Sequence, residues 1–289
     1  MKNILCFGEI LWDTFGDEKV PGGAPMNVAR HLAQQGEAVA FATRVGIDEP
    51  GMALVDFLKT SGLYSNLIQE DEELPTCEVT VQLDKAGQAT YIIPEPVSWD
   101  NIQTTDALTE AAINVAAIVF GSLACRGNTT RETLQSLLDE TTALKFFDVN
   151  LRPPHYEQST IQTFAAMADV IKMNEEEALL LMDGASGDLK EKILEFRSKY
   201  HFKTFCVTRG EHGALVWHDY EFFEHPGFKV EVMDTVGAGD AFLATFVTGL
   251  LAGKNMQEIL EKACAVGAFV AGKRGANPKY DADLLKLLR

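Results

Sequence analysis

The segment DTVGAGDAF (residues 234–242) places Gly237, Ala238 and Gly239 between two aspartates and in front of an apolar run. The apolar residues that follow recur at helical spacing, which predicts a helix with Asp240 in its first turn. The three backbone N–H groups before Asp240 would then be free at the positive end of the helix, where they suit a phosphate. A carboxylate beside them can take a proton from a hydroxyl that attacks phosphorus. An acidic residue is also common at any helix N-terminus, so this segment alone leaves both interpretations open.

The elements that must position such a site alternate along the chain. Short apolar runs that end in a polar residue or glycine are separated by helix-like segments; the runs include NILCFG, AVAFATRVG, AAIVFGS, ALKFFDVN, ADVIKMN and KTFCVTRG. This alternation predicts an α/β fold with a mainly parallel sheet covered on both faces. Ligands in such folds bind at the carboxyl ends of the strands. At 289 residues, we expect a single domain over residues 1–289 with a small appendage.

Composition excludes several classes of protein. Hydrophobic residues make up 46% and charged residues 23%, as in an ordinary soluble enzyme. The net charge of −17, without a Lys/Arg-rich block, argues against a nucleic-acid partner. Five scattered cysteines, an odd number without a C-x-x-C pair, indicate a reducing compartment. Glu9 and Asp13 interrupt the first apolar run, which does not suit a signal peptide, and no apolar stretch is long enough to span a bilayer. We therefore expect a cytoplasmic protein without a membrane partner.

A second glycine-rich segment, VPGGAPMNVARHLAQQG, carries Gly22 and Gly23 directly into a predicted helix with Asn27 in its first turn. Together with DTVGAGDAF it closely resembles the two signatures of the ribokinase-like (PfkB) sugar kinases. GEILWD resembles the family's first strand and sugar-binding aspartate, KMNEEEA its N-x-x-E element, and VTRGEHGALV its nucleotide loop. The resemblance covers nearly the whole chain and implies a ribokinase-like three-layer α/β/α fold with a small β-sheet lid.

The resemblance implies roles for the residues of both glycine-rich segments. Asp240 would be the catalytic base, and the N–H groups of residues 237–239 would stabilise the transferring phosphoryl group. A helix N-terminus should lower the pKa of Asp240, which a loose phosphoryl-transfer transition state tolerates. The residues implied to hold the sugar, with an arginine near the phosphates, are Asp13, Gly22, Gly23, Asn27 and Arg152.

The resemblance also implies a nucleotide and metal site for ATP and Mg²⁺. The residues implied to shape the nucleotide pocket are Asn174, Thr208, Gly210, Gly213 and Gly267. For Gly267, ordinary close helix packing is the alternative interpretation. Glu177 would reach Mg²⁺ through water, since this ion keeps several waters. Asp234 and the carbonyl of Val236, with the loop KRGANP, resemble a monovalent-cation site that would take K⁺.

The segment TCEVTVQLD alternates strictly and is followed by KAGQ and ATYIIP, which predicts a hairpin with one apolar face. That face comprises Cys77, Val79, Val81 and Leu83. We predict a lid formed from about residues 12–22 and 66–94, with a strand around Leu67. An exposed apolar strand invites aggregation, so we expect two copies to pack lid against lid as a homodimer, while the polar face or the lid edge closes over the sugar. The alternative is that the apolar face folds back onto its own domain.

The sugar is predicted from PGGAPMNVA and FDVNLRP, which look most like the fructokinase branch and imply conversion of fructose to fructose 6-phosphate. Tyr156 stands where that branch often has tryptophan. A 2-keto-3-deoxygluconate kinase would need a partner for the substrate carboxylate, such as Arg126 or Tyr91, and ribokinase is a further alternative. A nucleotide-binding oxidoreductase should carry G-x-G-x-x-G after its first strand, where this chain has FGEILWD. A catalytically inactive sugar-binding protein is disfavoured by Asp240, and His31 is predicted to be a packing or surface residue.

Overall fold

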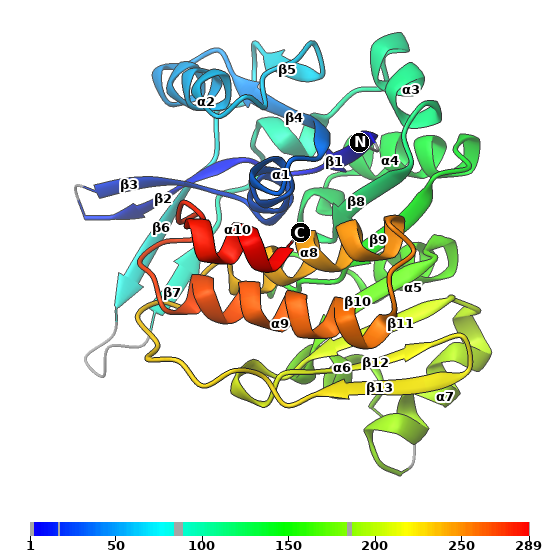
Figure 1. Ribbon diagram of the computed structural model, residues 1–289. Helices are drawn as coiled ribbons and strands as arrows, with labels where there is room; N and C mark the ends of the chain where they lie inside the picture. Colours follow the sequence, from blue (N-terminus) through cyan, green and yellow to red (C-terminus); the bar gives the residue numbers. More distant parts are fainter. Residues whose placement is uncertain (1–2, 17, 84–88, 184–186, 289) are drawn as a thin grey trace.

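The computed structural model describes residues 3–16, 18–83, 89–183 and 187–288, and contains one large and one small β-sheet (Figure 1). The large sheet has nine strands in the order β13 (Glu221–His225), β12 (Ala214–His218), β11 (Thr204–Thr208), β10 (Val170–Asn174), β9 (Leu144–Asp148), β8 (Ala117–Gly121), β1 (Asn3–Phe7), β4 (Ala38–Gly46) and β5 (Ile68–Asp71). Neighbouring strands from β11 to β5 pair in parallel, and β12 and β13 are antiparallel. The predicted mainly parallel sheet is confirmed.

Helices cover both faces of this sheet. One face packs against α3 (Asp106–Ile113), α4 (Asn128–Glu140), α5 (Gln158–Met167), α6 (Glu175–Leu181) and α7 (Leu189–Tyr200). The other packs against α1 (Ala24–Gln34), α2 (Glu49–Thr60), α8 (Ala238–Leu251) and α9 (Met256–Ala271), and α10 (Ala282–Leu288) lies on this last pair. In the described part of the chain, the short 3₁₀ helices η1 (Ser98–Asn101), η2 (Leu123–Arg126) and η3 (Gly210–His212) lie in connections. The three-layer α/β/α fold is therefore confirmed.

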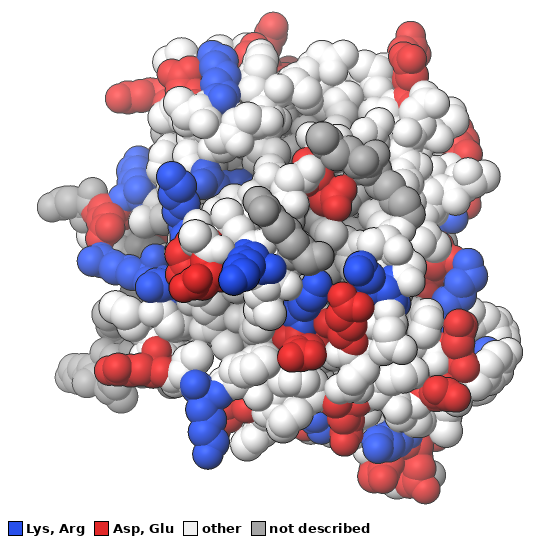
Figure 2. Space-filling view, in the orientation of Figure 1, with Lys and Arg blue, Asp and Glu red and all other residues white. Residues whose placement is uncertain are grey.

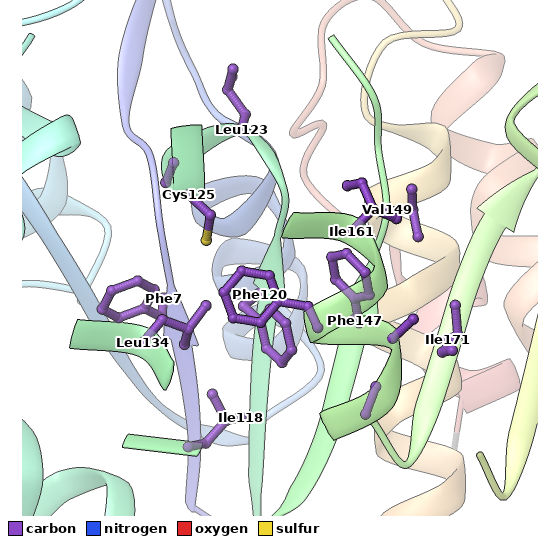
Figure 3. Close-up of a cluster of buried hydrophobic side chains, with 14 of the residues drawn as sticks. Phe7, Ile118, Phe120, Leu123, Cys125, Leu134, Phe147, Val149, Ile161 and Ile171 are labelled. Atoms are coloured by element: carbon purple, nitrogen blue, oxygen red, sulfur yellow. The ribbon is translucent and has the colours of Figure 1, made fainter. Parts of the chain in front are cut away.

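The strand runs are mostly apolar because both faces of each central strand are buried. In β1, Leu5 and Phe7 belong to the core on the α4 and α5 side, whereas Ile4 and Cys6 belong to the core on the α1 and α8 side. Figure 3 shows Phe7 with Phe120 and Phe147 in the first of these cores. The rings of the last two are stacked with centroids 5.2 Å apart. This packing fixes the strand ends that carry the polar residues of the site.

The small sheet comprises most of the segments predicted to form a lid, and it projects from the body in Figure 1. Its order is β3 (Glu18–Gly22), β2 (Leu11–Phe15), β6 (Glu78–Leu83) and β7 (Ala89–Ile92). The prediction that the segment around Leu67 joins the lid is wrong. Leu67 is buried in the main core, and the following strand β5 pairs with β4 at the edge of the large sheet. Residues 84–88 of the predicted lid lie outside the described residues.

The two faces of the lid are assigned by the strand register. Asp13 of β2 lies opposite Val79 of β6, so both side chains point to the same face. Val79 and Cys77 are only 1% and 0% exposed and belong to the core of their own domain. The expectation that a second copy covers this face is therefore wrong for these two residues, because the lid folds it inward beside Asp13. The side chains of Val81 and Leu83 lie outside the described residues.

The surface charges, the cysteines and the helices bear on the expectations from composition. On the face shown in Figure 2, Lys and Arg lie interspersed with Asp and Glu. All five cysteines are buried and free of disulfides. Within the described ranges, no helix combines the length and the apolar composition that crossing a bilayer requires.

Candidate active site

The N-terminus of α8 is shaped by Gly237, the residue that caps it. Gly237 has a left-handed backbone with φ 78°, and an added Cβ would lie 2.5 Å from the carbonyl oxygen of Ala276, so only glycine fits. Asp240 lies in the first turn, as predicted. The N–H of Ala238 donates to the carbonyl of Thr235 at 3.3 Å. Among the described residues, the N–H groups of Gly237 and Gly239 have no acceptor, so these two point to an anion site.

The second glycine pair brings the lid close to α1. A Cβ on Gly22 would collide with Oδ2 of Asp13, and a Cβ on Gly23 would lie 2.5 Å from the carbonyl oxygen of Glu9. Gly23 also has φ 111°, a conformation that disfavours other residues. The glycines therefore let the carboxylate of Asp13 lie directly beside the start of α1.

The two glycine-rich segments meet through one hydrogen bond. Nδ2 of Asn27, in the first turn of α1, donates to Oδ2 of Asp240 at 2.8 Å. These residues are 213 positions apart in the sequence, and α1 packs directly against α8. The structure thus brings the predicted catalytic and sugar-binding segments together at one point.

The electrostatics of Asp240 differ from the prediction. Burial and the negative charge of Asp148 raise its pKa to about 6, against the lowering influence of the bond from Asn27 and the charges of Lys172 and Arg152. The predicted downward shift at a helix N-terminus is wrong, because desolvation of the carboxylate outweighs the helix dipole. A carboxyl group with this pKa is a stronger base than an ordinary aspartate and is still ionised at neutral pH.

Arg152 lies in the loop after β9 and faces a group of acids. Its charge lowers the pKa of Asp13, Glu9 and Asp240, although burial dominates in each case and leaves the pKa of Asp13 raised to about 6. The arginine itself is exposed. A cation that is open to solvent and surrounded by carboxylates is well placed to receive a phosphate or a sugar hydroxyl.

Glu9, which sequence reasoning did not assign, is a buried carboxyl group in this cluster. It is 3% exposed, and among the described residues Oε2 has no hydrogen-bond partner. Burial raises its pKa to about 7, partly offset by the backbone N–H groups of Glu9 and Ala24. Ala24 begins α1, whose cap Gly23 has no side chain, so Glu9 supplies an acceptor there. An acid inside an apolar run was the only signal in the sequence.

A buried ion pair, also missed, lies beneath the start of α8. Nζ of Lys172 donates to both carboxylate oxygens of Asp148, at 2.8 and 2.9 Å. These residues lie opposite each other in β10 and β9. Burial opposes the charge of Lys172, but the carboxylate of Asp148 outweighs it and raises the pKa of the lysine. A Cβ on Gly239 would be 3.6 Å from Nζ, so this cation lies directly below the predicted anion site.

Asn174 and Glu177 form a capping box at the start of α6. The side chain of Asn174 accepts from the N–H of Glu177 at 2.8 Å, and Oε2 of Glu177 accepts from the N–H of Asn174 at 2.9 Å. Oε1 accepts from the N–H of Leu151 at 2.7 Å, next to Arg152. The N-x-x-E pattern is therefore explained in part by this capping box, which stabilises the start of α6.

The acidic residues fit Mg²⁺ in one way only. In the described part of the chain, no cluster of three or more His, Cys, Asp or Glu side chains could hold a metal directly. Both oxygens of Glu177 already accept backbone N–H groups, yet each has a second lone pair for water. Such a site suits an ion that keeps its waters and binds mainly to phosphates.

Of the predicted nucleotide residues, Gly210 borders open space, whereas Gly213 and Gly267 are explained by close packing. Thr208 ends β11, and Gly210, with φ 55°, has open space where a side chain would be. Gly213 has φ 74°, and a Cβ there would collide with the carbonyl of His225, so this glycine serves the turn into β12. Gly267 lies against α8, where an added Cβ would be 3.3 Å from the carbonyl oxygen of Ala238, which favours the helix-packing interpretation.

The two segments of the predicted cation site are adjacent. Oδ1 of Asp234 accepts from the N–H of Val236 and Oδ2 accepts from the N–H of Gly275, both at 3.0 Å. The carboxylate thus ties the loop before α8 to the loop KRGANP. The role of these residues in binding K⁺ stays a prediction.

Arg126, proposed above for a substrate carboxylate, is already engaged. Nε and Nη2 donate to the two carboxylate oxygens of Asp100 at 2.8 and 2.9 Å, and Nη2 also donates to the carbonyl of Pro94. The guanidinium lies over the ring of Trp99, and the side chain is 4% exposed. Arg126 therefore has a structural role. Tyr91 lies in β7, and its side chain is outside the described residues.

Comparison with known proteins identifies the family of this chain. A putative sugar kinase from Pyrococcus horikoshii is 30% identical over 306 residues, covering 98% of this chain and 94% of that protein. A probable fructokinase from Arabidopsis thaliana is 30% identical over 321 residues, covering 99% and 93%. A solved fructokinase from Vibrio cholerae, with fructose, ADP and potassium bound, has a TM-score of 0.84 at 26% identity and covers 100% and 99%. Residues 2–283 match the model of the pfkB family carbohydrate kinases, and the chain belongs to that family.

Proposed function

We propose that this carbohydrate kinase transfers the γ-phosphoryl group of ATP to the terminal primary hydroxyl of fructose, giving fructose 6-phosphate. The observation that carries the proposal is the contact between Asn27 and Asp240, which joins the sugar-binding segment to the base beside an anion site. The relatives named as fructokinases support the choice of sugar, as does Arg126, whose engagement with Asp100 weakens the keto-deoxy acid alternative.

The chemistry divides among the residues of the chain. Asp13 and Asn27 accept or donate hydrogen bonds to sugar hydroxyls and hold the primary hydroxyl beside Asp240. Asp240 takes the hydroxyl proton as the oxygen bonds to phosphorus and the bond from phosphorus to the ADP oxygen breaks. The free N–H groups at the start of α8, with Lys172 beneath them and Arg152 beside them, stabilise the charge on the transferring group.

Mg²⁺ would supply further charge neutralisation on the phosphates when bound. Glu177 would hold it through water, and Asp148 lies close enough to influence the pKa of Glu177. Asp234 and Val236 would hold K⁺ behind the start of α8. We further propose that the protein works as a cytoplasmic homodimer.

An ADP-release assay with fructose, ribose, 2-keto-3-deoxygluconate and tagatose tests the proposal. Fructose should give the highest kcat/KM, and the product should be consumed by phosphoglucose isomerase, which distinguishes the 6-phosphate from the 1-phosphate. A far better rate with the keto-deoxy acid would overturn the choice of sugar. Fructose binding without turnover would instead support an inactive sugar-binding protein.

A further inference from the structure

We infer that Asn277, in the loop between α9 and α10, is a positioning residue for Asp240 that acts through Asn27. Nδ2 of Asn277 donates to Oδ1 of Asn27 at 2.6 Å, while Nδ2 of Asn27 donates to Oδ2 of Asp240 at 2.8 Å. The three side chains form one continuous hydrogen-bonded chain that ends at the base. This inference rests on the proposed kinase function and assigns a residue outside both signature segments.

The direction of the chain is imposed by chemistry. An ionised carboxylate only accepts hydrogen bonds, so Asn27 must turn its NH₂ group toward Asp240. Its oxygen then faces Asn277, which must present a donor in return. Asn277 therefore selects between the two amide orientations of Asn27, one of which would set an oxygen against the base.

Within the described part of the chain, the side chain of Asn277 makes one hydrogen bond, the one to Asn27. Among the described residues, its Oδ1 is buried and has no hydrogen-bond partner. The bond to Asn27 is therefore the interaction that a substitution of Asn277 would remove.

His31 fixes the loop that carries Asn277. His31 lies one helical turn after Asn27 in α1 and is 0% exposed, so it is a packing residue. Burial lowers its pKa to about 4, so the ring is neutral at physiological pH. Nε2 donates to the carbonyl of Ala276 at 2.9 Å, which leaves Nδ1 to accept from the hydroxyl of Tyr280, also at 2.9 Å. Asn277 is thus held between two anchors on the helix that carries its partner.

The loop also connects the base to the predicted cation site. Gly275, two residues before Asn277, donates to Asp234, and Ala276 packs against Gly237 at the start of α8. A shift of this loop would therefore move the anion site and the orienting amide together.

Three variants at position 277 test the inference. Asn277→Ala removes the donor and should lower kcat about 3- to 10-fold, as expected for one hydrogen bond. Asn277→Asp keeps the shape but presents only acceptors to Oδ1 of Asn27, so its loss should exceed that of alanine. Asn277→His restores a donor and should recover part of the activity. The matched control is Asn66→Ala, an exposed residue before β5, which should not change kcat.

Two readouts distinguish positioning of Asp240 by Asn277 from a purely structural role of Asn277. The bond from Asn27 lowers the pKa of Asp240, so both Asn277→Ala and Asn277→Asp should move the acid limb of the kcat profile to higher pH. In an Asn27→Ala background, Asn277→Ala should have no further effect on kcat beyond about twofold, because residues acting through one another are not additive. Additive losses with an unmoved acid limb would overturn the inference.

The inference remains testable if the wild type phosphorylates none of the sugars. The pKa of Asp240 can be measured by carbon NMR on aspartate-labelled protein, with Asp240→Asn assigning the signal. A higher pKa in Asn277→Ala than in the wild type supports the orienting chain even then, and an unchanged value refutes it. Failure of the proposed function would appear separately, as absence of turnover in the wild type.

Discussion

Glu9→Gln should stabilise this protein at alkaline pH and destabilise it modestly at acidic pH. Burial raises the pKa of Glu9 from 4.5 to about 7. Folding therefore penalises the ionised form, and the penalty appears as pH rises through this interval. Below about pH 4.5 the carboxyl group is protonated in both the folded and unfolded chains and contributes no penalty.

The size of the effect follows from the same pKa. One pH unit of displacement corresponds to about 1.4 kcal/mol, so ionised Glu9 costs the fold at most about 3 kcal/mol above pH 7. Glutamine keeps an oxygen for the N–H of Ala24 but brings an NH₂ group to the position where Oε2 has no partner among the described residues. A buried donor without a partner costs about 1–2 kcal/mol. The expected net gain in the free energy of unfolding is therefore about 1–2 kcal/mol at pH 8.

Urea unfolding at pH 5 and pH 8 measures this difference. The wild type should lose stability between the two pH values relative to Glu9→Gln, because only the wild type pays to ionise the site. The matched control is Glu132→Gln on the exposed surface of α4, which should change the free energy of unfolding by less than about 0.5 kcal/mol at either pH. An equal gain at both pH values, or a loss at pH 8, would refute the reasoning.

Three further predictions concern the site and the lid. Asp240→Asn should lower kcat about 10²- to 10⁴-fold with little change in ATP binding. The wild-type kcat should rise with pH through about pH 6 as Asp240 ionises. Near-normal turnover of the variant would show that Asp240 is only an acidic residue at a helix N-terminus. Glu177→Gln should raise the Mg²⁺ requirement more than the sugar KM, whereas a raised KM with an unchanged Mg²⁺ titration would limit Glu177 to holding the loop of Arg152. Light scattering of the wild type should give about twice the chain mass of 31.7 kDa. Ile92→Asp, on the exposed lid face, should reduce the measured mass to that of one chain. A wild type that is both active and monomeric would contradict the dimer.

The fold, and the placement of Asn27 and Asp240 in the first turns of helices, could be predicted because both depend on local patterns. Mostly apolar runs between helical segments indicate strands buried on both faces, and the large sheet has this form. Asn27 and Asp240 each follow a glycine pair at the start of a helix, where the chain offers little choice of conformation. Their meeting depended on the family resemblance, since nothing in either segment specifies its partner.

The lid shows where local patterns become insufficient. Alternation identified an apolar face on Cys77 and Val79, but it could not decide what covers that face. The answer lies in the pairing of β6 with β2, which sets Val79 opposite Asp13 and turns the apolar face toward the domain. Register between distant strands depends on tertiary packing, and a hairpin sequence contains no record of it.

The charges of the site were the least predictable part, because burial and not sequence position governs them. The helix-dipole argument gave the wrong direction for the pKa of Asp240, since it considers one neighbouring element and omits both the desolvation caused by burial and the negative charge of Asp148. Lys172 interrupts the apolar strand β10, and its register with Asp148 explains how the charge is tolerated there.

Glu9, Asp13 and Asp240 lie around the exposed Arg152 and all have raised pKa values. Keeping these carboxyl groups ionised at neutral pH therefore lowers the stability of the fold. If Asp240 is the base, as we propose, the burial that weakens the fold at neutral pH also raises its pKa toward the range that suits a general base.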